Sequence, residues 1–371
     1  MEQDFQARAL GLYLHIPFCL SRCPYCNFFS KAYNRQAFSR YFELLLQQKE
    51  LSREYISRPL DSVYFGGGTP SLLSAEQINS FLEDLPLAAD CEITLEINPI
   101  MITESFVQEL KKTPINRLSL GVQSMIDKEL SYLGRKHKAK DIPPKIELLK
   151  NHGYHNLSAD LIYGIPSSSI KDVEASLQEL TELPIQHIST YLLEIEPESP
   201  LAKDISFIPE DETLEEMYHL IREQHETHGF RQYEISNFAR AGKESRHNLI
   251  YWQGGDYLGF GASAWGYVGG RRYYFPADLT QYEELIARGE ALGIEDKEAC
   301  AKADFIMMNL RLIQGLDLEE YQARFGEDIL EVKAREIKSL KAQDLIFLEG
   351  KTLKINPDAL FISNAVISEL I

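Results

Sequence analysis

The chain has 371 residues, 44% of them hydrophobic and 25% charged, which is an ordinary composition for a globular protein with one large and one smaller domain. Its 56 acidic residues outnumber its 38 basic ones, and the net charge of −18 argues against nucleic acid as the main partner, because phosphate backbones would be repelled. Five cysteines are too few for a disulfide framework and indicate a reducing compartment.

The sequence predicts a cytoplasmic protein. Residues 1–18 contain no basic segment followed by a long apolar run, so no signal peptide is expected. No stretch of about eighteen consecutive apolar residues occurs, so no transmembrane segment is expected.

From residue 11 to about residue 230, short β-branched apolar segments alternate with longer amphipathic ones. The expected strands cover residues 11–16, 61–65, 92–97, 116–121, 156–161 and 186–192. This alternation is typical of parallel strands joined by right-handed crossovers. Six such units fall short of the eight of a closed barrel. The sequence therefore predicts an α/β fold, a partial (β/α)6 barrel of the TIM type with a lateral opening.

Two segments between the first three strands have clear helical patterns. Residues 34–56 place four apolar side chains on one stripe, namely Phe38, Phe42, Leu45 and Leu46. Ser74 is followed three residues later by Gln77, which is the pattern of a capping box at a helix N-terminus.

The pattern changes after residue 230. Short Gly- and Tyr-rich segments are followed by helical patterns from about 280 to 341, and the tail contains two short strand candidates around Glu-Gly-Lys and then a helix. We predict a core domain over residues 1–235 and a smaller α+β or winged-helix-like C-terminal domain over residues 236–371.

Three cysteines lie within eight residues, directly after the first predicted strand. Cys19, Cys23 and Cys26 have the spacing C-x3-C-x2-C, and Phe28 follows in place of a fourth cysteine. A zinc site would need a fourth ligand, and His15 on the preceding strand is too constrained to supply it. A 4Fe–4S cluster with one open iron position fits three thiolates better, so the spacing favours a cluster over zinc or coincidence.

A glycine-rich segment, FGGGTPS at residues 65–71, follows the second predicted strand. Gly66, Gly67 and Gly68 allow the backbone to turn and to approach a ligand closely. A tight turn without a ligand is the alternative. The segment is not a P-loop, because no Gly-Lys-Ser/Thr follows.

Polar residues accompany the next three strands. Glu96 ends the third strand, Gln123 follows the fourth, Arg135 lies in the segment LGRKH beyond it, and Asp160 lies within the fifth. Taken singly, each is typical of a solvated or ion-paired surface position. Taken together they gather toward the C-terminal edge of the strands, where barrel enzymes bind their ligands.

The segment RHNLIYW at residues 246–252 contains the string H-N-x-x-Y-W, made by His247, Asn248, Tyr251 and Trp252. On residue types alone, the aromatic residues are core anchors and His247 caps a turn. The alternative is that His247 ligates heme iron while the rings pack on the porphyrin.

The cysteine spacing, with Tyr25 before the last cysteine, resembles the signature of the radical S-adenosylmethionine (SAM) superfamily. The glycine segment and several longer segments are similar to the oxygen-independent coproporphyrinogen III oxidase-like family, and this likeness covers nearly the whole chain. The resemblance implies a 4Fe–4S cluster on the three cysteines, with SAM chelated by the fourth iron and cleaved to methionine and a 5′-deoxyadenosyl radical. It also implies SAM contacts from Tyr13, Tyr25, Gly67, Gly68, Thr69, Glu96, Gln123, Arg135 and Asp160. Arginine would pair with the SAM carboxylate and a carboxylate with the ribose hydroxyls.

The H-N-x-x-Y-W string is similar to the heme-binding motif of the heme-chaperone branch of that family. This implies a protein that binds heme and transfers it to an acceptor, expected to be a respiratory heme enzyme, and that uses an electron donor for the cluster. The alternative is an oxygen-independent coproporphyrinogen III dehydrogenase, which decarboxylates two propionates oxidatively. Phe28 favours the chaperone, because the dehydrogenase branch carries a further cysteine there. Whether SAM is turned over, and so whether the chain is an enzyme, stays open.

Two positions depart from the pattern of that family. Trp265 stands where histidine is usual, and Phe275 stands where asparagine is common. These departures concern the surface of the second domain and not the cluster.

Overall fold

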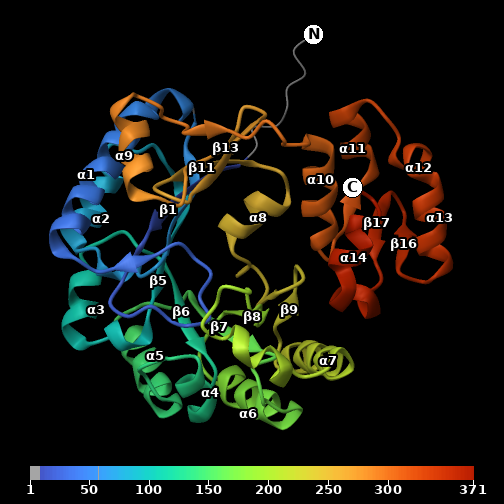
Figure 1. Cartoon of the computed structure of the whole chain (residues 1–371), viewed down its shortest axis with the longest axis horizontal. Coiled ribbons are helices and arrows are strands. Elements are labelled where there is room, and N and C mark those ends of the chain that lie inside the picture. Colours follow the sequence, from blue (N-terminus) through green and yellow to red (C-terminus); the bar gives the residue numbers. More distant parts are fainter. Residues whose placement is uncertain (1–8, 57) are drawn as a thin grey trace.

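The computed structural model describes residues 9–56 and 58–371 (Figure 1). Residues 1–8, which contribute to the predicted absence of a signal peptide, lie outside this range. Within the described part of the chain, every helix is too short or too polar to cross a lipid bilayer.

Six parallel strands form the centre of a twelve-stranded sheet. In spatial order they are β1 (Leu10–Ile16), β4 (Leu60–Gly67), β5 (Leu87–Ile97), β6 (Arg117–Gln123), β7 (Leu157–Tyr163) and β8 (His187–Leu192). All six predicted strands are confirmed. The spatial order follows the order along the chain, as right-handed crossovers between neighbouring strands require.

Shorter strands extend this sheet at both ends. Next to β1 lie β11 (Asp256–Phe260), β12 (Trp265–Val268), β13 (Arg271–Tyr274) and β14 (Ile294–Glu295). Next to β8 lie β10 (Asn237–Ala239) and β9 (Arg231–Gln232). The edges β14 and β9 are at opposite ends of the sheet, so it is curved but open, and the predicted partial barrel is confirmed.

Helices cover the outer face of the six central strands (Figure 1). They are α1 (Arg35–Leu51), α2 (Ala75–Leu82), α3 (Glu104–Leu110), α4 (Asp127–Tyr132), α5 (Ile142–Asn151), α6 (Ile170–Thr181) and α7 (Asp211–Thr227). The predicted capping box at Ser74 is present, and Phe38, Phe42 and Leu45 of α1 are buried as expected. Alternate strand residues such as Leu12 and Val63 are fully buried in the apolar core.

The C-terminal part has its own small sheet and helices, as predicted. The strands β15 (Leu316–Asp317), β17 (Thr352–Ile355) and β16 (Ile346–Glu349) pair in that order. The helices are α10 (Ala301–Arg311), α11 (Leu318–Phe325), α12 (Ile329–Val332), α13 (Ala334–Ala342) and α14 (Ser363–Ser368). The strands β11 to β14 belong to the large sheet, so that sheet continues past residue 235. The domain boundary expected between residues 235 and 236 stays a prediction.

One short helix lies on the other side of the sheet from the covering helices. Helix α8 (Arg246–Trp252) begins at the N-cap Ser245 and packs against β1, β4, β11 and α10 (Figure 1). It therefore connects the interior of the partial barrel with the C-terminal part of the chain.

Gln48 of α1 anchors distant parts of the chain to the barrel. Its side-chain oxygen accepts hydrogen bonds from the Gly261 backbone N–H at 3.0 Å and from the Tyr282 hydroxyl of α9 (Leu279–Ala287) at 2.7 Å. Gln48 and Tyr282 are fully buried, so the Gly261 N–H and the Tyr282 hydroxyl donate to the Gln48 oxygen in place of water.

We expect Gln48→Ala to lower the free energy of unfolding by about 1–3 kcal/mol, because it leaves buried donors without an acceptor. Gln47→Ala is the matched control, since Gln47 is the exposed neighbour on the same helix. Urea unfolding curves of both variants check this. Equal midpoints for the two variants would contradict the anchoring role.

Candidate functional site

The three predicted cluster ligands share one loop that starts at the C-terminal end of β1. Cys19 ends the two-residue strand β2 (Phe18–Cys19), which pairs with β3 (Lys31–Ala32) and so closes the loop at its base. Inside the loop, the Cys26 backbone N–H donates to the Cys23 carbonyl at 3.2 Å. The loop therefore has a defined backbone that presents all three cysteines from one segment.

The donor set of this loop fits a 4Fe–4S cluster. All three cysteines are free thiols, and burial raises the pKa of the Cys26 thiol. Nη1 of Arg135 donates to Cys23 Sγ at 3.7 Å. Among the described residues, no group of three or more His, Cys, Asp or Glu side chains is arranged around a single metal ion. Three free thiols on one loop are the ligands that a 4Fe–4S cluster with one open iron would use.

His15 ties the loop to the barrel, a role that the sequence analysis missed. Its Nε2–H donates to the Phe29 carbonyl at 2.9 Å, and its Nδ1 accepts from the Tyr13 hydroxyl at 3.0 Å. Both ring nitrogens of His15 therefore have hydrogen-bond partners. The sequence pattern that could have indicated this role is the polar His15 among apolar residues in the strand before the cysteines.

The glycine segment lies against the base of the cysteine loop. Gly68 N–H donates to the Ile16 carbonyl at 2.9 Å, and a Cβ on Gly68 would come within 2.9 Å of the backbone of Ile16 and Phe18. Gly67 has φ +108°, and a Cβ there would come within 2.8 Å of the His15 ring. Glycine is required at both positions, by close approach and by backbone conformation.

Two predicted carboxylates face the inside of the barrel, Glu96 from the end of β5 and Asp160 from the middle of β7, with β6 between the two strands. Glu96 accepts from the Tyr64 hydroxyl at 2.9 Å and from Gly67 N–H at 3.1 Å. Asp160 accepts from the Ser119 hydroxyl at 3.2 Å. Burial raises the pKa of Glu96 to about 7, with a contribution from Asp160, and burial raises the pKa of Asp160 to about 6. Each carboxylate therefore faces the barrel interior, where it could accept a hydrogen bond from a hydroxyl group of a bound ligand.

Gln123 and Arg135 meet beside the cysteine loop. Gln123 ends β6 with φ +73°, where the pairing with β7 shifts register. Arg135 donates from Nη2 to the Gly121 carbonyl at 2.6 Å, while its Nη1 reaches Cys23. Its Nε is buried without a partner among the described residues, so this guanidinium has capacity for a further acceptor.

The remaining predicted SAM contacts lie nearby. Tyr13 is next to the glycine segment, where a Cβ on Gly66 would come within 2.8 Å of its ring. Thr69 is buried directly after the glycines. Tyr25 packs against the small apolar cluster of Leu133, Ile162, Ile165 and Leu193. The structure therefore brings seven of the nine predicted residues to one end of the barrel or to the loops above it, while Asp160 lies in the middle of β7 and Tyr13 lies in the middle of β1 with its ring also 6.3 Å from that of His247.

His247 lies in the interior of the partial barrel and is 2% exposed. Its Nδ1 is 2.8 Å from the Ser62 hydroxyl, its Nε2 is 2.6 Å from the Tyr251 hydroxyl, and its ring stacks on Tyr64 at 5.0 Å. Burial and the nearby charge of Arg117 lower the pKa of His247 to about 3, so its imidazole is neutral near pH 7.

A second Ser–His–Tyr series of hydrogen bonds lies on the other side of Arg117. Ser158 is 2.8 Å from His187 Nδ1, and His187 Nε2 is 2.8 Å from the Tyr233 hydroxyl. Arg117 is 2% exposed and lies 3.9 Å from the Glu92 carboxylate. The sequence analysis missed Arg117 and His187, whose signal was again polar residues in alternate strand positions.

The other two motif residues have contacts separate from those of His247. The Asn248 backbone N–H caps on the Ser245 hydroxyl at 3.4 Å. The Trp252 ring packs on the Arg311 guanidinium of α10 at 4.9 Å, and its Nε1 is buried without a partner among the described residues. The motif is thus divided between the barrel interior and the C-terminal part.

Comparisons with known proteins agree with this geometry. Residues 13–180 match the Radical SAM superfamily, and residues 303–362 match the HemN C-terminal domain. A solved structure of coproporphyrinogen III oxidase (HemN) from Escherichia coli superposes with a TM-score of 0.83 over 98% of this chain and 90% of that one, at 21% identity, which shows a common fold. The fold and the cysteine loop define a radical SAM protein.

Two similar curated proteins narrow this class. The protein named heme chaperone HemW from Bacillus subtilis (strain 168) is 32% identical, over 95% of this chain and 97% of its own length. The protein of the same name from Escherichia coli (strain K12) is 33% identical, over 86% and 88%. The chain belongs to the HemW family.

The raised pKa of Glu96 makes the contribution of this residue to stability depend on pH. The folded state disfavours the charged carboxylate, so wild-type stability is lost as pH rises from the ordinary pKa of 4.5 through about 7. We expect Glu96→Gln to gain stability relative to wild type at pH 8 and to differ little near pH 4.5. Urea unfolding across this range checks it, with the exposed Glu179→Gln as control. A pH-independent difference would contradict the buried charge.

Proposed function

We propose that this chain is a heme chaperone, which binds heme through His247 and transfers it to an acceptor protein. The observation that carries the proposal is a neutral imidazole enclosed by the rings of Tyr13, Tyr64 and Tyr251 inside the barrel. Neutral imidazole is the form that ligates heme iron, and aromatic rings suit a porphyrin face. The names of the two curated relatives support the same function.

Iron binding at His247 requires an exchange of partners. Both ring nitrogens are hydrogen-bonded in this conformation, so iron must replace either the Tyr251 or the Ser62 hydroxyl. Both hydroxyls belong to short contacts inside the barrel, and α8 carries His247 and Tyr251 together. Heme binding therefore involves a local movement of α8 away from β4.

Cluster and SAM occupy the other end of the barrel in this proposal. When bound, the 4Fe–4S cluster supplies an open iron for SAM and one-electron chemistry. Arg135 pairs with the SAM carboxylate, because its Nε lacks a partner and its fork suits a carboxylate. Gly67, Gly68 and Thr69 line the amino group, and Asp160 or Glu96 accepts hydrogen bonds from ribose hydroxyls.

The acceptor is proposed to be a respiratory heme enzyme, and a separate electron donor reduces the cluster in the cytoplasm. The alternative function, oxidative decarboxylation of coproporphyrinogen III, is less well supported. Phe28 occupies the position of the additional cysteine and is 62% exposed beside the cysteine loop. An aromatic side chain there offers apolar surface and no metal ligand.

We expect Cys23→Ser to remove nearly all cluster absorbance and most iron after anaerobic reconstitution, because serine is a poor ligand for this cluster. Cys300→Ser is the control, since Cys300 is an exposed thiol outside the loop. Iron analysis and visible spectra check this. Unchanged iron content in Cys23→Ser would overturn the cluster assignment.

Heme titration of the cluster-loaded protein tests the role of His247. We expect His247→Ala to lose most of the heme affinity, and Ser62→Ala to bind heme about 3- to 10-fold faster, because one hydrogen bond holding the ring is gone. Ser158→Ala, which removes the equivalent bond to His187, leaves heme binding unchanged. Equilibrium titration measures the heme affinity of each variant, and stopped-flow absorbance measures its rate of heme binding.

Two results would refute the proposed function. Equal heme affinity of wild type and His247→Ala would remove His247 from the site. Production of protoporphyrinogen IX from coproporphyrinogen III by the reconstituted protein would favour the dehydrogenase.

A further inference from the structure

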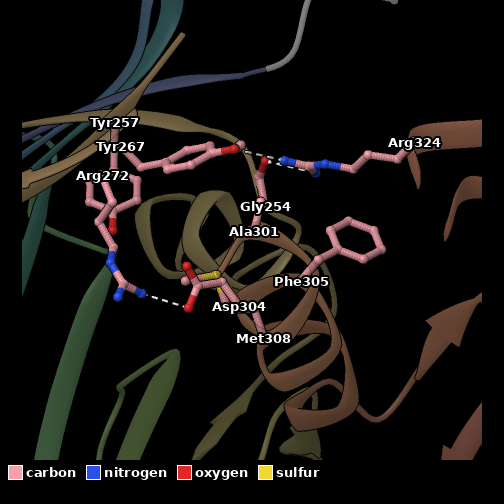
Figure 2. Close-up of a pocket in the computed structure, with 10 residues that line it drawn as sticks. Gly254, Tyr257, Tyr267, Arg272, Ala301, Asp304, Phe305, Met308 and Arg324 are labelled. Carbon is pink, nitrogen blue, oxygen red and sulfur yellow. Dashed lines mark hydrogen bonds and ion pairs between the residues drawn. The ribbon is translucent and has the colours of Figure 1, made fainter. Parts of the chain in front are cut away.

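A narrow pocket separates the β11–β13 part of the large sheet from helix α10 (Figure 2). Its volume is about 20 Å³, and the side chains that decide its chemistry are Tyr257, Tyr267, Arg272, Asp304, Phe305 and Arg324. A cavity of this size holds one or two water molecules, so it admits a small polar group and excludes a ring.

The two arginines of this pocket differ in charge compensation. Arg272 forms ion pairs with Asp296 at 2.7 Å and with Asp304 at 2.5 Å, so two carboxylates neutralise it. Arg324 of α11 donates only to uncharged oxygens, the Tyr267 hydroxyl at 3.1 Å and the Gly254 carbonyl at 3.4 Å. Figure 2 shows both arginines reaching the pocket from opposite sides.

Arg324 is thus a cation that has no carboxylate partner among the described residues. Within the described part of the chain, no acidic group lies within 4.0 Å of its guanidinium. Its charged group is held over the rings of Phe305 at 4.7 Å and Phe325 at 5.7 Å, which partly desolvate it. A half-buried guanidinium in this setting favours an incoming anion, and its planar fork matches a carboxylate.

The pocket is adjacent to the H-N-x-x-Y-W motif. Tyr257, which lines the pocket, contacts the Tyr251 ring edge-on at 4.4 Å. Tyr251 in turn contacts His247 through its hydroxyl at 2.6 Å. Two aromatic rings therefore span the path from the imidazole to the pocket.

We propose that this pocket binds a propionate carboxylate of heme, with Arg324 as the cationic partner and the Tyr267 hydroxyl beside it. The inference rests on the proposed function and assigns the second end of the ligand, whose iron lies at His247. Since Arg324 belongs to α11 and His247 to α8, bound heme joins the barrel to the C-terminal part of the chain. The size of the pocket fits the carboxylate and leaves the porphyrin ring outside it.

The test compares hemin with hemin dimethyl ester, in which both propionates have lost their charge. Cluster-loaded full-length protein is titrated with each compound and followed by visible absorbance. We expect wild type to bind hemin with a dissociation constant about tenfold lower than that for the ester, because one charge-assisted hydrogen bond typically contributes about this much to binding. Arg324→Gln removes this preference while it binds the ester as wild type does, and Arg324→Lys keeps part of it.

The comparison within one variant separates folding from recognition, because a misfolded variant would lose both compounds equally. Arg271→Gln is the control, since Arg271 is an exposed arginine on β13, next to Arg272, and we expect this variant to keep the full preference for hemin. Arg324→Gln with an undiminished preference for hemin overturns this site, and so does wild type without any preference. If His247→Ala still abolishes binding in that case, the proposed function stands without the carboxylate site.

Discussion

A charged guanidinium enclosed in the partial barrel sets the conditions for the rest of the interior. Arg117 is 2% exposed, and its nearest carboxylate, from Glu92, is 3.9 Å away. A buried cation is tolerated only among polar partners. The inner face of the strands accordingly carries hydroxyls, imidazoles and carboxylates, while the alternate residues pack against the outer helices. Burial, with a further contribution from the charge of Arg117, lowers the pKa of both His187 and His247.

The parallel direction of the strands then decides where ligands bind. Each of the strands β1, β4, β5, β6 and β7 ends at the same edge, so the cysteine loop, the glycine segment and the polar strand ends meet there. Arg135 links the two halves of this end, since one guanidinium reaches both Cys23 and the Gly121 carbonyl. His15 links the loop to the strand beneath it.

Helix α8 links the interior of the barrel to the C-terminal part of the chain. It places His247 and Tyr251 among the aromatic rings of the barrel interior, and Trp252 on Arg311 of α10. A displacement of α8 would therefore change contacts in both parts of the chain. The pocket at Arg324 lies along the same contact path, two rings from the imidazole. Heme handling by this protein, as proposed, thus depends on the contact between the barrel and its C-terminal part.

Much of this was available from the sequence, because it depends on local spacing. The short apolar strands, the capping box at Ser74, the cysteine spacing and the glycine segment are short-range patterns, and the strands and the capping box formed as expected. The C-terminal edge could also be predicted, since parallel strands leave no other arrangement. Tertiary structure alone decided the partners of His247, the second histidine chain around Arg117, and the uncompensated charge of Arg324. These depend on contacts between residues far apart in the chain, such as Ser62 with His247, and no local pattern specifies which buried polar groups will meet.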